Sequence, residues 1–234
     1  MKVAALITAA GRGSRMGTRE SKPYLVLADK PILAHTLYQF EQCSLIDEVV
    51  LIVSKSEIEH SKASIIEAFM FEKVSKIIAG GLKRQDSVWE GLKSLKRDCE
   101  LVMVHDGVRP FVSQEILEKS IQEASRSGAA IVSVPVKDTV KMASEQGDVL
   151  ETLDRSTLWA VQTPQTFKYE ILKSAYKKAF EDGFYGTDDA SLVERLGIKV
   201  KIIPGSYENI KITTPEDLAL SEVILRRRAK QRSS

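Results

Sequence analysis

Short apolar segments alternate with helical patterns along this chain, and that alternation limits the fold more than any other feature. The segments with the character of buried strands are residues 3–7, 49–53, 74–79, 101–105 and 129–134. Between them apolar side chains recur at helical spacing, as in Ile32, Leu33, Thr36, Leu37 and Phe40. Strands that alternate with helices usually pair in parallel. The sequence therefore predicts an α/β fold, with a mainly parallel sheet and helices on both faces.

The length and charge of the chain favour one ordinary globular domain. A chain of 234 residues with 43% hydrophobic residues can bury one substantial core, so residues 1–234 are predicted to form a single domain. The net charge of +2 is too small to indicate general nucleic-acid binding. The basic residues near the C-terminus, from Arg226 to Arg232, are interpreted as a solvated helix end, where cations suit the helix dipole.

The cysteines and histidines carry no metal or disulfide pattern. Cys43 and Cys99 form no Cys-x-x-Cys pair, so we expect reduced thiols packed in the core of a cytoplasmic protein. The three histidines are too scattered for a zinc site, and His105 is interpreted as structural. No segment approaches the length of a membrane span, and no membrane partner is expected.

A glycine-rich loop with two spaced cations follows the first predicted strand. Residues 9–17 read Ala-Ala-Gly-Arg-Gly-Ser-Arg-Met-Gly, and Lys22 comes soon after them. Glycine lets backbone amides approach an anion closely, and Arg15 and Lys22 supply the opposite charge. The pattern predicts a loop that holds polyphosphate. The plainer alternative is that the glycines only turn the chain from strand to helix.

Two familiar phosphate-binding loops do not match this segment. No Gly-Lys-Ser/Thr follows the first glycine at the spacing of a P-loop. The spacing of Gly11, Gly13 and Gly17 is one residue too long for a dinucleotide loop. The second predicted strand also ends in Ser54 and Lys55 rather than in an acid for a ribose hydroxyl. A dehydrogenase is therefore a weak alternative.

The loop resembles the nucleotide loop of sugar-phosphate nucleotidyltransferases and, more narrowly, that of the 2-C-methyl-D-erythritol 4-phosphate cytidylyltransferase family. The resemblance recurs in the family's order along nearly the whole chain. The further matching segments are residues 80–88 (Gly-Gly … Arg-Gln-x-Ser-Val), 104–110 (Val-His-Asp-x-x-Arg-Pro), 134–141, 154–165, 187–191 (Thr-Asp-Asp-Ala-Ser) and 209–213 (Asn-Ile-Lys-Ile-Thr). One such motif would be weak, whereas several in order favour this family.

The resemblance implies a Rossmann-like domain that transfers CMP from CTP to 2-C-methyl-D-erythritol 4-phosphate and releases pyrophosphate. Arg15 and Lys22 match the positions that stabilise charge on the reacting phosphates. Such a reaction between anions needs positioning and charge neutralisation rather than a covalent intermediate. Mg²⁺ is expected to accompany CTP. Asp106 ends a predicted strand and is the expected carboxylate beside the metal, although a turn or capping role is the alternative.

The remaining matched positions divide between the two substrates. Those that hold the nucleotide in the family correspond to Ala10, Gly11, Gly81 and Ser87. Arg155 and Lys211 correspond to positions that orient the acceptor phosphate for attack. Further acceptor-side positions correspond to Arg109, Thr139, Thr187 and Thr213, of which the two hydroxyls of Thr139 and Thr187 could bind the polyol or its phosphate. For these last four a purely structural role is nearly as plausible.

A polar hairpin interrupts the strand–helix alternation. Residues 138–143 and 149–153 read as two short strands around the turn Glu-Gln-Gly-Asp at 145–148. A hairpin with little apolar face is marginal on its own, so it is either a loose excursion or lies against another subunit. The resemblance implies the latter: a β-arm at about residues 137–157 that forms a homodimer and carries Arg155 across the interface.

Two other functions remain open at this point. A ribitol 5-phosphate cytidylyltransferase would share the nucleotide loop, Asp106 and much of the arm, although segments 187–191 and 154–159 look more like the methylerythritol branch. A module that binds CTP without turning it over is the alternative from another class. The presence together of Arg15, Lys22, Asp106, Arg155 and Lys211 disfavours it.

Overall fold

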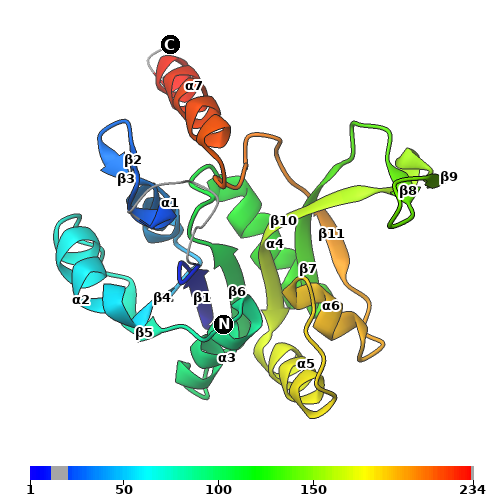
Figure 1. The fold of residues 1–234 in the computed structure, drawn as a ribbon. Helices are drawn as coiled ribbons and strands as arrows, with labels where there is room; N and C mark the ends of the chain where they lie inside the picture. The colour runs from blue at the N-terminus through cyan, green and yellow to red at the C-terminus, as the bar shows by residue number, and fades with distance from the viewer. Residues whose placement is uncertain (12–20, 233–234) are drawn as a thin grey trace.

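A seven-stranded sheet forms the centre of the molecule in the computed structural model, which describes residues 1–11 and 21–232 (Figure 1). In spatial order its strands are β11 (Lys201–Pro204), β7 (Ala129–Pro135), β10 (Trp159–Lys168), β6 (Leu101–Asp106), β1 (Val3–Thr8), β4 (Glu48–Val53) and β5 (Val74–Ala79). Strand β10 runs antiparallel to β6 and β7, and the other neighbours pair in parallel. The predicted α/β fold with a mainly parallel sheet is confirmed.

Helices cover both faces of this sheet. They are α1 (Ile32–Gln42), α2 (Ile58–Ser61), α3 (Arg84–Ser94), α4 (Gln114–Ser127), α5 (Tyr169–Glu181), α6 (Asp189–Glu194) and α7 (Pro215–Arg232). Single 3₁₀ turns occur at η2 (Lys22–Tyr24), η3 (Lys55–Glu57) and η5 (Arg155–Thr157), and η4 (Lys62–Glu67) is a short π-helical segment. Helices α1 and α4 pack into the core on one face, and α3, α5 and α6 pack into the core on the other.

The central position of β1 in the sheet explains why its sequence is almost continuously apolar. Successive side chains of a strand point to opposite faces of the sheet. Val3, Ala5 and Ile7 belong to one core cluster, whereas Ala4 and Leu6 belong to the other. All five are fully buried. A central parallel strand with helices on both sides therefore has no polar face.

The order of the strands reverses beside β1. The chain passes from β1 to β4 and β5 on one side and then returns to place β6 on the other side of β1. In open α/β sheets, ligands bind at the carboxyl ends of the strands where the order reverses. The ends of β1 and β6 bring residues 9–11 and Asp106 to that position.

The predicted hairpin is present and stands away from the sheet (Figure 1). It consists of β8 (Lys141–Ala143) and β9 (Val149–Thr152), which pair antiparallel, and its residues are exposed. Gly147 turns the chain with a positive φ of 92°, which glycine adopts without strain. A second small hairpin, β2 (Val26–Leu27) with β3 (Lys30–Pro31), precedes α1.

The C-terminal helix α7 begins as the sequence predicts. Thr214 Oγ1 accepts from the amide of Asp217, and the carboxylate of Asp217 accepts from the amide of Thr214, which is a reciprocal cap. The prediction for its basic end needs correction. Arg227 and Arg228 both pair with Glu208, so this part of the helix contacts the protein instead of being solvated along all sides.

Two further expectations concern the thiols and membrane spans. Cys43 and Cys99 are free and buried, as the sequence predicts. In the part of the chain that the structure describes, no helix is both long enough and apolar enough to cross a membrane.

Candidate active site

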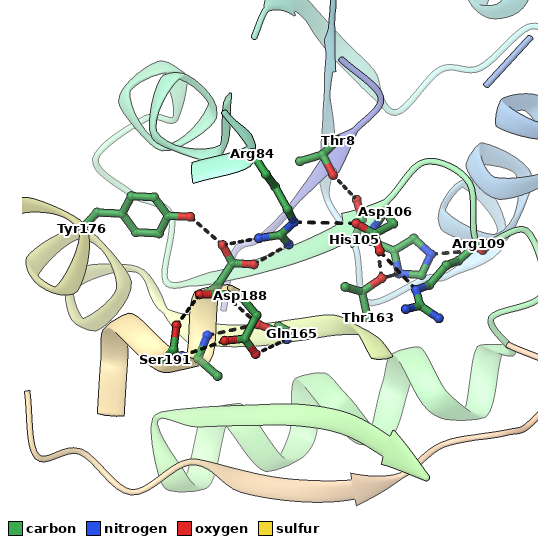
Figure 2. A network of polar contacts seen from close by, with 12 residues as sticks. Thr8, Arg84, His105, Asp106, Arg109, Thr163, Gln165, Tyr176, Asp188 and Ser191 are labelled. Atoms are coloured by element: carbon green, nitrogen blue, oxygen red, sulfur yellow. Dashed lines mark hydrogen bonds and ion pairs between the residues drawn. The ribbon is translucent and has the colours of Figure 1, made fainter. Parts of the chain in front are cut away.

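Asp106 lies at the carboxyl end of β6, surrounded by three cations. Its Oδ2 is 3.1 Å from Arg109 Nε, and its Oδ1 is 3.7 Å from Arg84 Nε (Figure 2). The same Oδ2 is 3.0 Å from Lys211 Nζ. The side chain is only 7% exposed. Burial alone would raise the pKa of Asp106, but the charges of Lys211, Arg84 and Arg109 outweigh it and hold the pKa well below its usual range. Asp106 is therefore an ionised carboxylate that fixes three cations around one point.

Arg84 links this carboxylate to a second buried acid. It extends from the first turn of α3 and binds Asp189 through two parallel bonds, of 3.0 Å from Nη1 and 2.7 Å from Nη2 (Figure 2). Asp189 is fully buried and also accepts from the hydroxyl of Tyr176 at 2.5 Å. A bidentate arginine–carboxylate pair has a fixed geometry. Arg84 therefore holds α3, α6 and the end of β6 in one arrangement.

The loop before α6 is anchored by Gln165 of β10. The Gln165 side chain donates to Asp188 Oδ2 at 2.9 Å and accepts from the amides of Asp189 and Ala190, both at 3.1 Å. Asp188 in turn caps α6 by accepting from the amide of Ser191. These bonds keep the preceding residue, Thr187, at the edge of the cavity described next.

A cavity of about 480 Å³ opens beside these groups. Its lining combines cations, carboxylates and polar side chains: Arg84, Asp106, Arg109, Ile131, Val161, Gln162, Thr163, Gln165, Thr187, Asp188, Ser191, Glu194 and Lys211. Such a lining is suited to a small polar anion, because several cations and hydroxyls converge on one space. Four sequence-predicted residues, Asp106, Arg109, Thr187 and Lys211, meet here.

The segment between β11 and α7 carries Lys211 and contacts Lys22. Asn209 is buried, and its Nδ2 donates to Gln162 Oε1 at 3.1 Å and to the carbonyl of Thr163 at 2.9 Å. Lys22 Nζ donates to the carbonyl of Thr213 at 2.7 Å, although Lys22 comes from η2 far away in the sequence. Lys22, Lys211 and Thr213 therefore lie on neighbouring parts of the fold.

The predicted nucleotide-binding residues also come together, at the carboxyl ends of β1 and β5. A methyl group on Gly80 would lie 2.7 Å from Cβ of Ala10 and 2.7 Å from Oγ of Ser87, so only glycine allows this close packing. Ser87 Oγ accepts from the amide of Gly81 at 3.1 Å. Gly11 is exposed, with nothing within 4 Å of where its Cβ would be.

His105 is structural, as the sequence analysis expects. Its Nε2 is 3.1 Å from the carbonyl of Arg109, and its Nδ1 is 3.1 Å from Thr163 Oγ1. Burial lowers its pKa to about 4, so the ring is neutral near neutral pH. Thr163 Oγ1 also accepts from the amide of Asp106 at 3.0 Å, so His105 and Thr163 together fix the end of β6.

The comparisons with known proteins point to one family. The sequence model of 2-C-methyl-D-erythritol 4-phosphate cytidylyltransferase matches residues 3–227. The chain belongs to this family. Proteins of that name from Alkaliphilus oremlandii and Alkaliphilus metalliredigens are 49% and 51% identical to it, over 99% and 97% of this chain and 98% and 94% of theirs.

Solved structures agree with the sequence comparison. A 4-diphosphocytidyl-2C-methyl-D-erythritol synthase from Anaerococcus prevotii superposes with a TM-score of 0.86 at 34% identity, covering 96% of this chain and 98% of the other. A 2-C-methyl-D-erythritol 4-phosphate cytidylyltransferase from Thermus thermophilus gives a TM-score of 0.79 at 32% identity, covering 97% and 100%. The fold of the cytidylyltransferase family therefore extends over nearly the whole chain.

Not every residue predicted from the cytidylyltransferase motifs reaches the cavity of this chain. Thr139 and Arg155 are exposed near the arm and are absent from the described cavity lining. Arg155 donates instead to the carbonyl of Lys137 at 2.6 Å. Thr213 lies beside Lys22 rather than in the cavity wall. Arg15 lies outside the described residues.

Arg84, Asp189 and Gln165 are site residues that were not predicted from the sequence. Arg84 and Asp189 both lie inside recognised cytidylyltransferase motifs, at 80–88 and 187–191, so a signal was present. Their pairing was not visible, because they are separated by 105 residues in the chain. Gln165 carried no signal beyond its place in the motif at 154–165.

The acidic side chains of the described residues could hold magnesium only together with ligands from the substrate. Within residues 1–11 and 21–232, no group of three or more His, Cys, Asp or Glu side chains could hold a metal ion. Mg²⁺ commonly takes one or two carboxylates and completes its shell with substrate phosphates and water. Asp106 suits that role, because it is ionised and, among the residues that the structure describes, its Oδ1 has only the 3.7 Å contact with Arg84.

Proposed function

We propose that this protein transfers CMP from CTP to 2-C-methyl-D-erythritol 4-phosphate and releases pyrophosphate. One observation carries the proposal: in a chain of the cytidylyltransferase family, Arg84, Arg109 and Lys211 surround one ionised carboxylate beside a cavity suited to an anion. The acceptor phosphate and the α-phosphate of CTP are both anions. Their approach requires cations held in place before the reaction begins.

The chemical step would be an in-line attack by an acceptor phosphate oxygen on the α-phosphorus of CTP. A new P–O bond forms to the acceptor, and the bond to the bridging oxygen of pyrophosphate breaks. The attacking group is already ionised, so the step needs no general base and no covalent intermediate. The work of the protein is positioning and charge neutralisation.

The cations of this chain divide naturally between the two substrates. Lys211 and Arg109 face the cavity and would hold the acceptor phosphate. Lys22, together with Arg15, would stabilise charge on the α-phosphate and on departing pyrophosphate. A lysine gives a mobile point charge and an arginine a planar fork, so the two can bind different oxygens. Ala10, Gly11, Gly81 and Ser87 would place backbone and hydroxyl groups against CTP.

Mg²⁺ is the proposed cofactor, with Asp106 as its protein ligand. When bound, the ion would neutralise charge on the CTP phosphates. The chain's own contribution is an ionised carboxylate that the surrounding cations keep deprotonated. If Asp106 also held the metal, Lys211 and Arg109 would be free to bind the acceptor.

A homodimer is the proposed assembly, with Arg155 acting in the site of the neighbouring subunit. Two features support this. Arg155 lies at the base of an exposed hairpin and does not line the cavity of its own chain. The hairpin also exposes Met142, Val149 and Leu150, with 46%, 62% and 61% of their surfaces accessible. A second subunit would cover these apolar side chains.

The buried, unpaired thiols support a cytoplasmic location.

The test is pyrophosphate release with CTP, magnesium and 2-C-methyl-D-erythritol 4-phosphate. Parallel reactions replace the acceptor by ribitol 5-phosphate and replace CTP by ATP, GTP or UTP. We expect turnover only with CTP and the methylerythritol acceptor. Turnover only with ribitol 5-phosphate would correct the acceptor. Binding of CTP by the folded protein without release in any reaction would favour the non-catalytic module.

A further inference from the structure

We propose that helix α7 is a positioning element of the active site, which holds segment 208–214 at both ends through Asp217 and Arg228 and so fixes Lys211. The inference rests on the proposed function, in which Lys211 orients the acceptor phosphate. Asp217 and Arg228 would touch neither substrate. They would act through the segment that they hold.

Asp217 holds the end of the segment next to the helix. One oxygen of its carboxylate, Oδ2, accepts from the amide of Thr213 at 2.8 Å, from Thr213 Oγ1 at 2.9 Å and from the amide of Thr214 at 2.9 Å. Hydrogen bonds to an ionised acceptor are among the stronger ones in proteins. This end of the segment is therefore tied to the first turn of α7.

Arg228 holds the opposite end of the segment, near the other end of the helix. Its Nε donates to Glu208 Oε2 at 2.9 Å, and its Nη2 donates to the carbonyl of Phe111 at 2.9 Å. Arg227 also pairs with Glu208. The side chains of Arg228 and Glu208 are only 25% and 24% exposed, so solvent screens this pair less than it screens an ordinary surface pair.

The two contacts belong to one face of α7. Asp217, Ser221, Ile224 and Arg228 follow the i, i+4, i+7, i+11 spacing of a helical stripe. Ser221 is fully buried and donates to the carbonyl of Asp217 at 2.7 Å. Ile224 is 5% exposed and packs in one cluster with Ile212, a residue of the held segment. The apolar contact lies between the two polar ones, so the helix and the segment form a single packed unit.

The held segment has no helix or strand of its own, yet it supplies three contacts to the site. Lys211 Nζ is 3.0 Å from Asp106. The carbonyl of Asn209 accepts from Arg109 Nη1 at 2.8 Å, and the carbonyl of Thr213 accepts from Lys22 Nζ at 2.7 Å. A misplacement of about 1 Å in such groups can cost on the order of 10²-fold in rate. The position of α7 therefore bears on both lysines.

Glu208→Gln is the variant that tests this inference, because it keeps the size of the side chain and removes the charge that both arginines bind. We expect kcat/KM for the acceptor to fall on the order of tenfold, with KM for CTP and the melting temperature close to wild type. Arg228→Lys, which keeps the charge but loses the fork, should retain more activity than Arg228→Ala.

Arg226→Ala is the matched control. Arg226 is a neighbouring arginine of the same helix, but it pairs with Glu222 of α7 itself and does not reach the segment. This variant should keep wild-type kinetics. Equal losses in Arg226→Ala and Arg228→Ala would overturn the inference, because they would show only an effect of charge on the helix.

Hydrogen exchange gives a readout that does not depend on turnover. Amides of residues 208–214 should exchange faster in Glu208→Gln than in wild type. In Arg226→Ala their exchange rates should equal those of wild type. Unchanged exchange in Glu208→Gln, or a lowered melting temperature with an unaltered kcat/KM for the acceptor, would overturn the inference. If the wild-type protein turns over no acceptor, the proposed function fails, and the exchange rates still decide whether α7 holds the segment.

Discussion

Loss of Lys22 should lower the rate of the proposed reaction strongly. Its side chain is buried with 8% exposure, and its Nζ lies beside Thr213 in the segment of Lys211. We predict that Lys22→Ala lowers kcat by roughly 10²–10³-fold, as expected for one preorganised electrostatic group. Lys119→Ala, which removes an exposed lysine paired with Glu115 on α4, is the control. Near-normal turnover of Lys22→Ala would contradict the assignment.

Cys99 offers a residue-scale test of the fold by pH. Burial raises the pKa of its thiol from 9.0 to about 11. The folded state therefore favours the neutral thiol. The contribution of Cys99 to the free energy of unfolding is fully present below pH 9 and is lost as pH rises toward 11, because the unfolded thiol ionises first. In a Cys43→Ser variant at pH 8, we predict alkylation of Cys99 at least about a hundredfold slower in folded than in denatured protein. Equal rates in the two states would show that Cys99 is not buried as described.

Single residues also show what the sequence can and cannot reveal. Asp106, Arg109 and Lys211 were predicted because each lies in a recognised motif and carries a charge that phosphate chemistry uses. The structure adds that they contact one another. The pair of Arg84 and Asp189 was not predicted, because it joins α3 to α6 across 105 residues. Long-range pairing depends on the folded arrangement of the sheet, and no local pattern encodes it.

At the scale of elements, the turn between β5 and α3 should affect the nucleotide more than the acceptor. A methyl group at Gly80 would come within 2.7 Å of Ala10 and Ser87, so one of them would have to move. We predict that Gly80→Ala raises KM for CTP several-fold, of the order of 1 kcal/mol for an overpacked contact, and leaves KM for the acceptor unchanged. Gly183→Asn, at an open position with positive φ, is the control. The measurement is steady-state kinetics with each substrate varied in turn. A change in the acceptor KM alone would contradict the prediction.

The β8–β9 arm makes a sharper prediction about assembly. If each site combines Lys22 of one subunit with Arg155 of the other, mixing Lys22→Ala and Arg155→Ala subunits restores one complete site in each mixed dimer. Random mixing of two inactive variants should then recover about a quarter of wild-type activity. The measurement is turnover after joint refolding, with sedimentation to confirm dimers. No recovery in mixed dimers would exclude the shared site.

Elements also differ in how well the sequence predicts them. The strands β1, β4 and β6 were predicted from their local apolar segments, because strands covered on both faces are almost wholly apolar. Strand β10 was not predicted. It buries Gln162, Thr163, Gln165 and Thr166, polar residues that find partners in neighbouring elements, so it lacks an apolar pattern. The polar arm was predicted from its turn residues and short alternating strands.

At the scale of the whole molecule, the arrangement points to one chemical outcome. Ala10 and Gly81 lie at the carboxyl ends of β1 and β5, and Asp106 with its cations lies at the end of β6. Both substrates would therefore meet where the strand order reverses. Helix α7 adds contacts from outside the sheet, and in the proposed dimer the arm would add others from a second subunit. The proposed reaction requires that CMP, and not a terminal phosphate, moves to the acceptor.

The most direct measurement follows the label from CTP that carries ³²P at either the α or the γ position, with 2-C-methyl-D-erythritol 4-phosphate and magnesium. Attack on the α-phosphorus predicts that α label appears in a cytidylylated sugar product and γ label appears in pyrophosphate. Recovery of α label as free CMP, or of γ label on the acceptor, would contradict the account.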